Sequence, residues 1–204
     1  MIFLRRETFK QYLQLYPVTS AILAIIAVLF AAMEITGSST DAITLLNFGA
    51  MYSNSGETHE WWRYINSMFL HIGFSHVLFN AFALYVFAPP LERLLGKFHY
   101  AGFFLLSGLV GNAFSMLFTE PPFIAAGASG AIYGVYAAYV YLAIFHRHVL
   151  DEGTRSTVIA IVVMGGITSL IIPNVNIFAH LGGFVAGFVY FAVLTRRLRR
   201  RSQR

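Results

Sequence analysis

The sequence contains no cysteine, and charged residues make up only 11% of its 204 residues. The absence of cysteine excludes disulfide bonds, a thiol nucleophile and cysteine-held zinc or iron–sulfur centres. Soluble domains carry about 25% charged residues, so this chain has too few to cover itself with a polar surface in water. A hydrophobic share of 57% and a mean hydropathy of +0.66 place it in a lipid bilayer. The length allows one domain.

Positive charge is unevenly distributed along the chain. Of the 14 lysines and arginines, six lie in the last nine residues, RRLRRRSQR, and the formal net charge is +5. Such a cluster beside an apolar segment is typical of a cytoplasmic flank, whereas a nucleic-acid site needs basic residues spread over a face. The sequence therefore predicts no nucleic-acid partner.

Apolar segments long enough to span a membrane recur along the chain. A helix needs roughly 20 residues to cross about 30 Å of hydrocarbon, and the ten-residue alternating strands of a membrane barrel are absent. The first segment is longer than the apolar part of a cleaved signal sequence, which favours a retained anchor. The sequence predicts an all-α polytopic membrane protein with six transmembrane helices near residues 17–35, 68–88, 99–118, 127–145, 156–172 and 177–195.

Lysine and arginine also set the expected orientation. With six spans, only Arg63 of the 14 falls on one side of the membrane, and the others fall on the side of the two termini. Because cytoplasmic loops are enriched in these residues, both termini are predicted to be cytoplasmic. The expected organisation is an interfacial N-terminal segment (1–16), a six-helix membrane domain (17–195) and a basic cytoplasmic tail (196–204).

Polar side chains inside a span are costly and therefore mark candidate sites. Ser129 lies at the outer end of the fourth span, and His180 lies about one turn into the sixth. His76 and Asn80 lie about two to three turns into the second. Because these spans run in the same direction, all four side chains are expected in the outer half of the membrane. His71 also falls in the second span but is expected to face elsewhere.

These features also have structural interpretations. GASG, with Gly130 and Gly134, has the small-residue spacing that lets two helices approach closely, and Gly183 and Gly187 repeat it. His180 alone would serve equally well as a hydrogen-bonding partner for a neighbouring helix. His76 and Asn80 are four residues apart on one face of the second span, so their side chains could satisfy each other's hydrogen bonding.

The chemistry open to such a site is narrow. Paired aspartates are excluded because the only two, Asp41 and Asp151, fall in an outer loop and a cytoplasmic link. The zinc-hydrolase pattern His-Glu-x-x-His is absent, and neither a metal nor another cofactor is expected. The hydrolase elbow Gly-x-Ser-x-Gly is not met because residue 131 is alanine. A serine activated by a histidine remains.

The residues therefore predict a Ser–His dyad, formed by Ser129 and His180 from different helices, without an orienting carboxylate and with the histidine held by packing. The small residues of the sixth span would permit the close approach that the dyad requires. Donors to a developing oxyanion would be His76, Asn80 and the Ser129 backbone N–H, which lies at a helix start where amides are unpaired.

Four short motifs resemble those of rhomboid intramembrane serine proteases. They are WWR in the first outer loop, HVLFN in the second span, GASG opening the fourth and AHLGG in the sixth. The resemblance covers nearly the whole chain, from the first span to the last. It matches the minimal six-helix bacterial form of the family.

The resemblance implies roles for particular residues. Ser129 would be the nucleophile and His180 its general base, with Tyr133 stacked on the His180 ring. His76 and Asn80 would donate to the oxyanion. An alternative for Arg63, which the resemblance does not exclude, is contact with a lipid headgroup. The supporting positions are Gly127, Gly130, Gly183, Gly187, and Trp62 and Arg63 in a partly membrane-embedded outer loop.

By the same resemblance, the chain would be a serine endopeptidase of the bacterial inner membrane with its site open to the outer side. It would cleave single-span or polytopic membrane proteins in or near their transmembrane segments. A non-catalytic relative that binds transmembrane helices remains an alternative. A small transporter is a further alternative, although the sequence has no internal repeat or midplane charge pair. The oligomeric state is not predicted.

Overall fold

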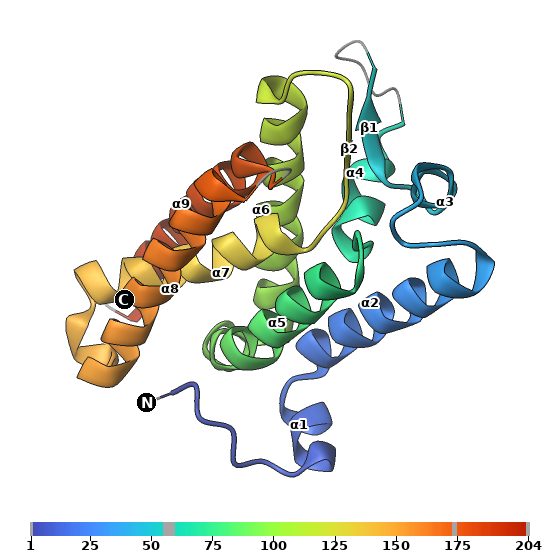
Figure 1. Ribbon diagram of the computed structural model, residues 1–204. Coiled ribbons are helices and arrows are strands. Elements are labelled where there is room, and N and C mark those ends of the chain that lie inside the picture. Colours follow the sequence, from blue (N-terminus) through green and yellow to red (C-terminus); the bar gives the residue numbers. More distant parts are fainter. Residues whose placement is uncertain (1, 55–59, 173–174, 203–204) are drawn as a thin grey trace.

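The computed structural model describes residues 2–54, 60–172 and 175–202, and Figure 1 shows their arrangement. Helices form most of this part of the chain. In chain order the elements are α1 (Phe9–Leu15), α2 (Pro17–Thr36), α3 (Ala42–Asn47), β1 (Met51–Ser53), α4 (Arg63–Asn66), the 3-10 helix η1 (Ser67–Phe69), α5 (Phe74–Leu95), α6 (Lys97–Phe118), β2 (Phe123–Ala125), α7 (Ser129–Phe145), the 3-10 helix η2 (Arg147–Val149), α8 (Glu152–Ile171) and α9 (Ile177–Ser202).

Five of the described helices are long and apolar enough to cross a bilayer, namely α2, α5, α6, α8 and α9. α7 is also apolar but has only 17 residues, which rise about 25 Å. All six apolar segments predicted from the sequence contain a helix, and the all-α membrane class is confirmed. The number of crossings stays a prediction, because α7 is shorter than the roughly 20 residues that a span usually needs.

The helix of the second predicted span begins later than expected. Gly73 has a φ of +78°, in the left-handed region, and α5 starts directly after it. The helix then continues through Pro89 and Pro90. A span starting at residue 68 was wrong because Met68, although apolar and buried, belongs to η1, and Leu70 lies in the connection between η1 and α5.

Three helices form the centre of the bundle. α6, α7 and α9 pack closely against one another (Figure 1). α7 also contacts α5, which in turn packs against α2. α8 makes lighter contacts with α7 and α9. Most of α7 is enclosed by protein, so this short helix need not face lipid along its length. The largest buried side chains of this core include Leu84, Leu91, Tyr100, Phe103, Phe104, Tyr139 and Phe191.

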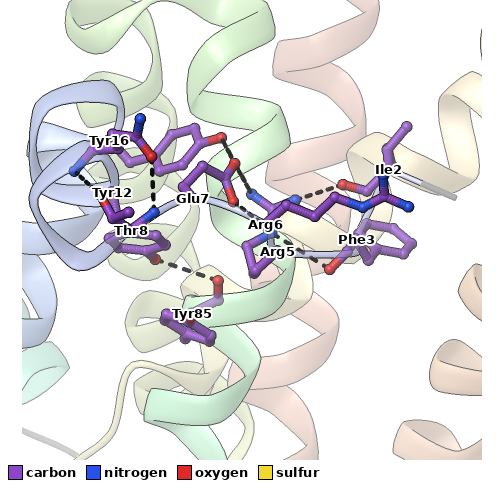
Figure 2. A network of polar contacts seen from close by, with 10 residues as sticks. Ile2, Phe3, Arg5, Arg6, Glu7, Thr8, Tyr12, Tyr16 and Tyr85 are labelled. Atoms are coloured by element: carbon purple, nitrogen blue, oxygen red, sulfur yellow. Dashed lines mark hydrogen bonds and ion pairs between the residues drawn. The ribbon is translucent and has the colours of Figure 1, made fainter.

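The N-terminal segment is ordered by its own polar contacts (Figure 2). Thr8 begins α1 with a capping box, and Tyr16 OH donates to Glu7 Oε1 at 2.7 Å. This hydrogen bond lowers the pKa of the Glu7 carboxyl below its ordinary value. Arg5 donates in turn to the Tyr16 hydroxyl at 3.3 Å. The segment therefore has a defined path before the first long helix.

The start of the chain docks on the end of the bundle where α8 begins. The Ile2 N–H donates to Thr154 Oγ1 at 3.1 Å, and Phe3 packs edge-on against Phe87 and Tyr139. Figure 1 places this segment on the same side of the molecule as the C-terminal half of α9.

The chain between α2 and α5 forms a small layer on the opposite side of the molecule (Figure 1). It contains α3, β1, α4 and η1, and β1 pairs antiparallel with β2 so that Met51 lies opposite Ala125. The sequence gives no sign of this pairing, since three-residue strands are too short to show alternation. The pairing holds the segment that enters α7 against the chain between α2 and α5.

Candidate active site

Ser129 is the first residue of α7 and follows a firmly held turn. The Gly127 N–H donates to the Ser67 carbonyl at 2.9 Å, and the Ala128 N–H donates to His71 Nε2 at 3.4 Å. Gly127 has a φ of +145°, a conformation that residues with a side chain rarely adopt. These contacts fix the backbone from which the half-buried Ser129 side chain extends.

The side chains of His76 and Ser129 lie around the same point. A Cβ placed on Gly127 would be 2.9 Å from His76 Nε2 and 3.8 Å from Ser129 Oγ. Asn80, one turn further along α5, is buried, and its carboxamide donates one N–H to the His76 carbonyl at 2.9 Å. Glycine at 127 therefore keeps open a space that α5 and α7 both face.

His180 lies on α9 with its ring flat against Tyr133 of α7. The two ring centroids are 4.0 Å apart, and the ring planes differ by 8°. His180 is buried. Because Tyr133 is one turn after Ser129, this stack places the His180 ring beside the start of α7. It is the contact that the family resemblance implied for Tyr133.

The backbones of α7 and α9 touch next to these side chains. A Cβ on Gly183 would overlap the Gly130 carbonyl oxygen, and one on Gly187 would lie 2.5 Å from Gly134 Cα. α6 joins the contact through Gly111, where a Cβ would lie 2.6 Å from a backbone oxygen of α9. The small-residue spacing in the sequence indicated the glycines of α7 and α9 but not Gly111. Together these glycines allow the backbones of α6, α7 and α9 to contact one another beside the candidate site.

A hydroxyl that no sequence pattern indicated contacts the His180 ring. Ser169 Oγ of α8 lies 2.8 Å from His180 Nδ1 and 2.9 Å from the Tyr133 hydroxyl. The His180 ring is therefore held by a hydrogen bond at Nδ1 in addition to its packing against Tyr133. An isolated serine in an apolar helix gives no signal in the sequence that separates it from other such serines.

His71 lies nearer to the candidate site than expected. Its ring is completely buried, with its centroid 5.1 Å from that of His76. The expectation that it faces elsewhere was wrong because it assumed one helix through both histidines. His71 precedes the turn at Gly73, which brings its ring against the N–H of Ala128.

The Arg63 side chain makes its contacts within the chain between α2 and α5. Its guanidinium donates to the carbonyls of Leu46 at 2.7 Å and Ala50 at 3.1 Å. It also pairs with Glu60 at 2.6 Å and lies over the Trp62 ring at 4.5 Å. Because the Arg63 side chain is only 11% exposed, these internal contacts are favoured over the alternative of a lipid headgroup. Trp62 and Arg63 thus hold α4 to the preceding part of the loop.

The polar groups gathered here are a hydroxyl, imidazoles, a carboxamide and a backbone N–H at a helix start. Across residues 2–54, 60–172 and 175–202, no three or more histidine, cysteine, aspartate or glutamate side chains are grouped so as to hold a metal ion. A hydroxyl beside an imidazole can act as a nucleophile, and the N–H donors can stabilise a developing oxyanion.

Comparison with known proteins identifies the family. The Rhomboid domain matches residues 58–197, more than half of the chain. The chain belongs to the rhomboid family. This result confirms the resemblance seen in the four sequence motifs, and the matched region contains every residue of the candidate site.

Individual rhomboid relatives match over different shares of their length. The chain is 34% identical over 205 aligned residues to the rhomboid-family protein YdcA of Bacillus subtilis, covering 98% of this chain and 100% of the relative. It is 32% identical over 176 residues to rhomboid protease GluP of the same organism. It is 30% identical over 131 residues to rhomboid-type serine protease 2 of Emericella nidulans. The chain spans only 34% of GluP and 26% of the Emericella protein.

Proposed function

We propose that this chain hydrolyses peptide bonds in or near transmembrane segments of other proteins, with Ser129 as nucleophile and His180 as general base. The chain is a rhomboid-type serine endopeptidase and a membrane protein. The observation that carries the residue assignment is the stack of His180 on Tyr133, one turn after Ser129. It supports the dyad because it brings an imidazole to the helix start that presents the serine hydroxyl.

The proposed reaction follows the general course of acyl transfer to serine. Ser129 Oγ attacks the scissile carbonyl carbon while His180 Nε2 accepts the hydroxyl proton, and the carbonyl electrons move to oxygen. The C–N bond then breaks as His180 returns the proton to the leaving amine, which leaves an acyl ester on Ser129. Water attacks this ester with His180 again as base, the C–O bond to Ser129 breaks as His180 returns the proton to Ser129 Oγ, and the new carboxylic acid departs. Protein groups and water suffice for every step.

The oxyanion in this scheme is stabilised by donors from two helices. The Ser129 N–H lies at the start of α7, where the first amides have no intrahelical acceptor. His76 reaches the same space from α5, and the second N–H of Asn80 would complete the set. Donors fixed in place before the reaction cost no reorganisation as charge develops.

Removing either side-chain donor is expected to slow the chemical step. His76→Ala and Asn80→Ala should each lower kcat by about 10²–10³, the effect of losing one oxyanion donor. Steady-state rates in liposomes, with KM measured alongside, test this. His99→Ala, at an exposed histidine of α6, is the matched control. Wild-type kcat in both variants would exclude these side chains from the oxyanion site.

The proposed setting is a bacterial cell membrane, with cytoplasmic termini and a site that opens to the outer side. The lysine and arginine distribution supports this orientation. So does the separation of the N-terminal segment from the layer that contains Arg63, which lie on opposite sides of the molecule (Figure 1). Expected substrates are single-span or polytopic membrane proteins. A substrate helix must unwind locally, because its own hydrogen bonds shield the scissile carbonyl.

The direct test is cleavage by the purified protein in liposomes. A generic single-span substrate is added, and mass spectrometry of the products locates the cut. We expect a cut in or near the transmembrane segment. Inactivity towards several unrelated single-span substrates would contradict the proposal, and a protein that still bound their helices would then be a non-catalytic relative.

A further inference from the structure

Ser169 lies where α8 meets the candidate active site. Most described side chains of α8 are exposed or half-buried, and Thr154, Val158 and Ser169 are its buried residues. Ser169 is 7% exposed. The buried residue nearest the C-terminal end of this helix is therefore a serine rather than an apolar residue.

The Ser169 hydroxyl has three polar neighbours. Its oxygen lies 2.7 Å from the Gly165 carbonyl oxygen, 2.8 Å from His180 Nδ1 and 2.9 Å from the Tyr133 hydroxyl. A serine hydroxyl has one proton to donate and two lone pairs to accept with. The Gly165 carbonyl can only accept, so it takes the Ser169 proton at the shortest of the three distances. His180 Nδ1 and the Tyr133 hydroxyl must then both donate to Ser169.

This assignment favours a neutral His180 ring that carries its proton on Nδ1. A neutral imidazole has one N–H and one acceptor nitrogen. With the proton on Nδ1 and directed at Ser169, the Nε2 lone pair is available to accept the Ser129 proton. The opposite tautomer would leave Nε2 protonated and unable to act as a base.

We propose that Ser169 is a positioning residue that fixes the active tautomer and the orientation of His180. The inference rests on the proposed function of Ser129 and His180. The Tyr133 ring sets the plane of the imidazole through stacking, and Ser169 sets its rotation within that plane. In other serine hydrolases a buried carboxylate orients the histidine. A neutral hydroxyl performs the task here without placing a charge at membrane depth, which is costly.

Substitution of Ser169 is expected to slow catalysis without weakening substrate binding. Ser169→Ala should lower kcat by about ten- to a hundredfold with KM unchanged, as expected for loss of one hydrogen bond to a group that becomes charged. Ser169→Thr retains a hydroxyl and should restore most of the rate. The matched control is Thr168→Ala, since Thr168 also donates to the Gly165 carbonyl, at 2.9 Å, one position away.

The wild-type protein offers a readout that needs no variant at position 169. Protein labelled with ¹⁵N-histidine is studied by NMR near neutral pH, and the His180 signals are identified by their loss in His180→Ala. We expect a protonated Nδ1 and an unprotonated Nε2. A His180 ring protonated on Nε2 alone would overturn the inference.

The outcomes separate this inference from the proposed function. If Ser129→Ala cleaves like wild type, the dyad itself is wrong. If Ser129→Ala is inactive but Ser169→Ala matches Thr168→Ala in kcat, the dyad stands and the role of Ser169 is excluded. A drop confined to Ser169→Ala, with recovery in Ser169→Thr and the Nδ1-protonated tautomer in wild type, supports the inference.

Discussion

Ser129→Ala and His180→Ala will each reduce cleavage below detection. The first variant removes the attacking oxygen, and the second removes the group that accepts its proton and later protonates the leaving amine. Loss of either member of such a unit costs on the order of 10⁶ in kcat. Reconstituted variants and wild type are compared on the same single-span substrate, with thermal unfolding in detergent to show that each variant is folded.

Two features of this series distinguish a catalytic unit from local damage. The double variant should be no slower than either single variant, because the two residues act in the same step. Ser156→Ala and His99→Ala, at exposed positions of α8 and α6, should retain the wild-type rate. Cleavage by Ser129→Ala at the wild-type rate would show that this serine is only a small residue between helices.

Gly183→Ala will destabilise the protein and reduce its activity. The new Cβ would overlap the Gly130 carbonyl oxygen, a backbone atom that no side-chain rotation can move away. Overpacking of this kind costs about 1–3 kcal/mol and occasionally more, and we expect the upper end or beyond. α9 must then shift away from α7. The contact lies at Gly183, three residues after His180, and at Gly130, one residue after Ser129. A displacement of about 1 Å at a reacting pair can cost 10²-fold in rate.

Gly166→Ala is the control for this variant. Gly166 also lies in a long apolar helix, α8, but a Cβ there meets nothing within 4 Å. Replacing a helical glycine by alanine at an open position favours the helix by about 0.5–1 kcal/mol. Thermal unfolding and cleavage rate should therefore drop for Gly183→Ala and stay level or rise for Gly166→Ala. Equal behaviour of the two variants would mean that the α7–α9 contact is not close.

Much of the candidate site could be found from the sequence because of the cost of polar groups in a membrane. That cost leaves few polar side chains at depth, so Ser129, His180, His76 and Asn80 stood out. Small-residue spacing likewise indicated the contact between the helices of Gly130 and Gly183. Both signals depend on residue type and spacing along one helix, which a sequence displays directly.

Ser169, His71 and the β1–β2 pair depend on information that the sequence does not display. The hydroxyl of a serine in an apolar helix can donate to a backbone carbonyl of the preceding turn, as Ser169 does to Gly165. Such a serine therefore costs little free energy in the membrane, and its presence does not indicate a functional site. Its contact with His180 depends on how α8 is rotated about its axis. His71 was misplaced because hydropathy continues through the turn at Gly73. Three-residue strands carry no pattern at all.

Activation of Ser129 by His180 can be tested by covalent labelling of the serine. The folded protein is treated with a fluorophosphonate, which reacts with activated serine hydroxyls, and the labelled residue is located by peptide mass spectrometry. We predict one adduct, on Ser129, in the wild-type protein and none in His180→Ala under the same conditions. An adduct on another serine, or equal labelling of Ser129 in both proteins, would contradict it.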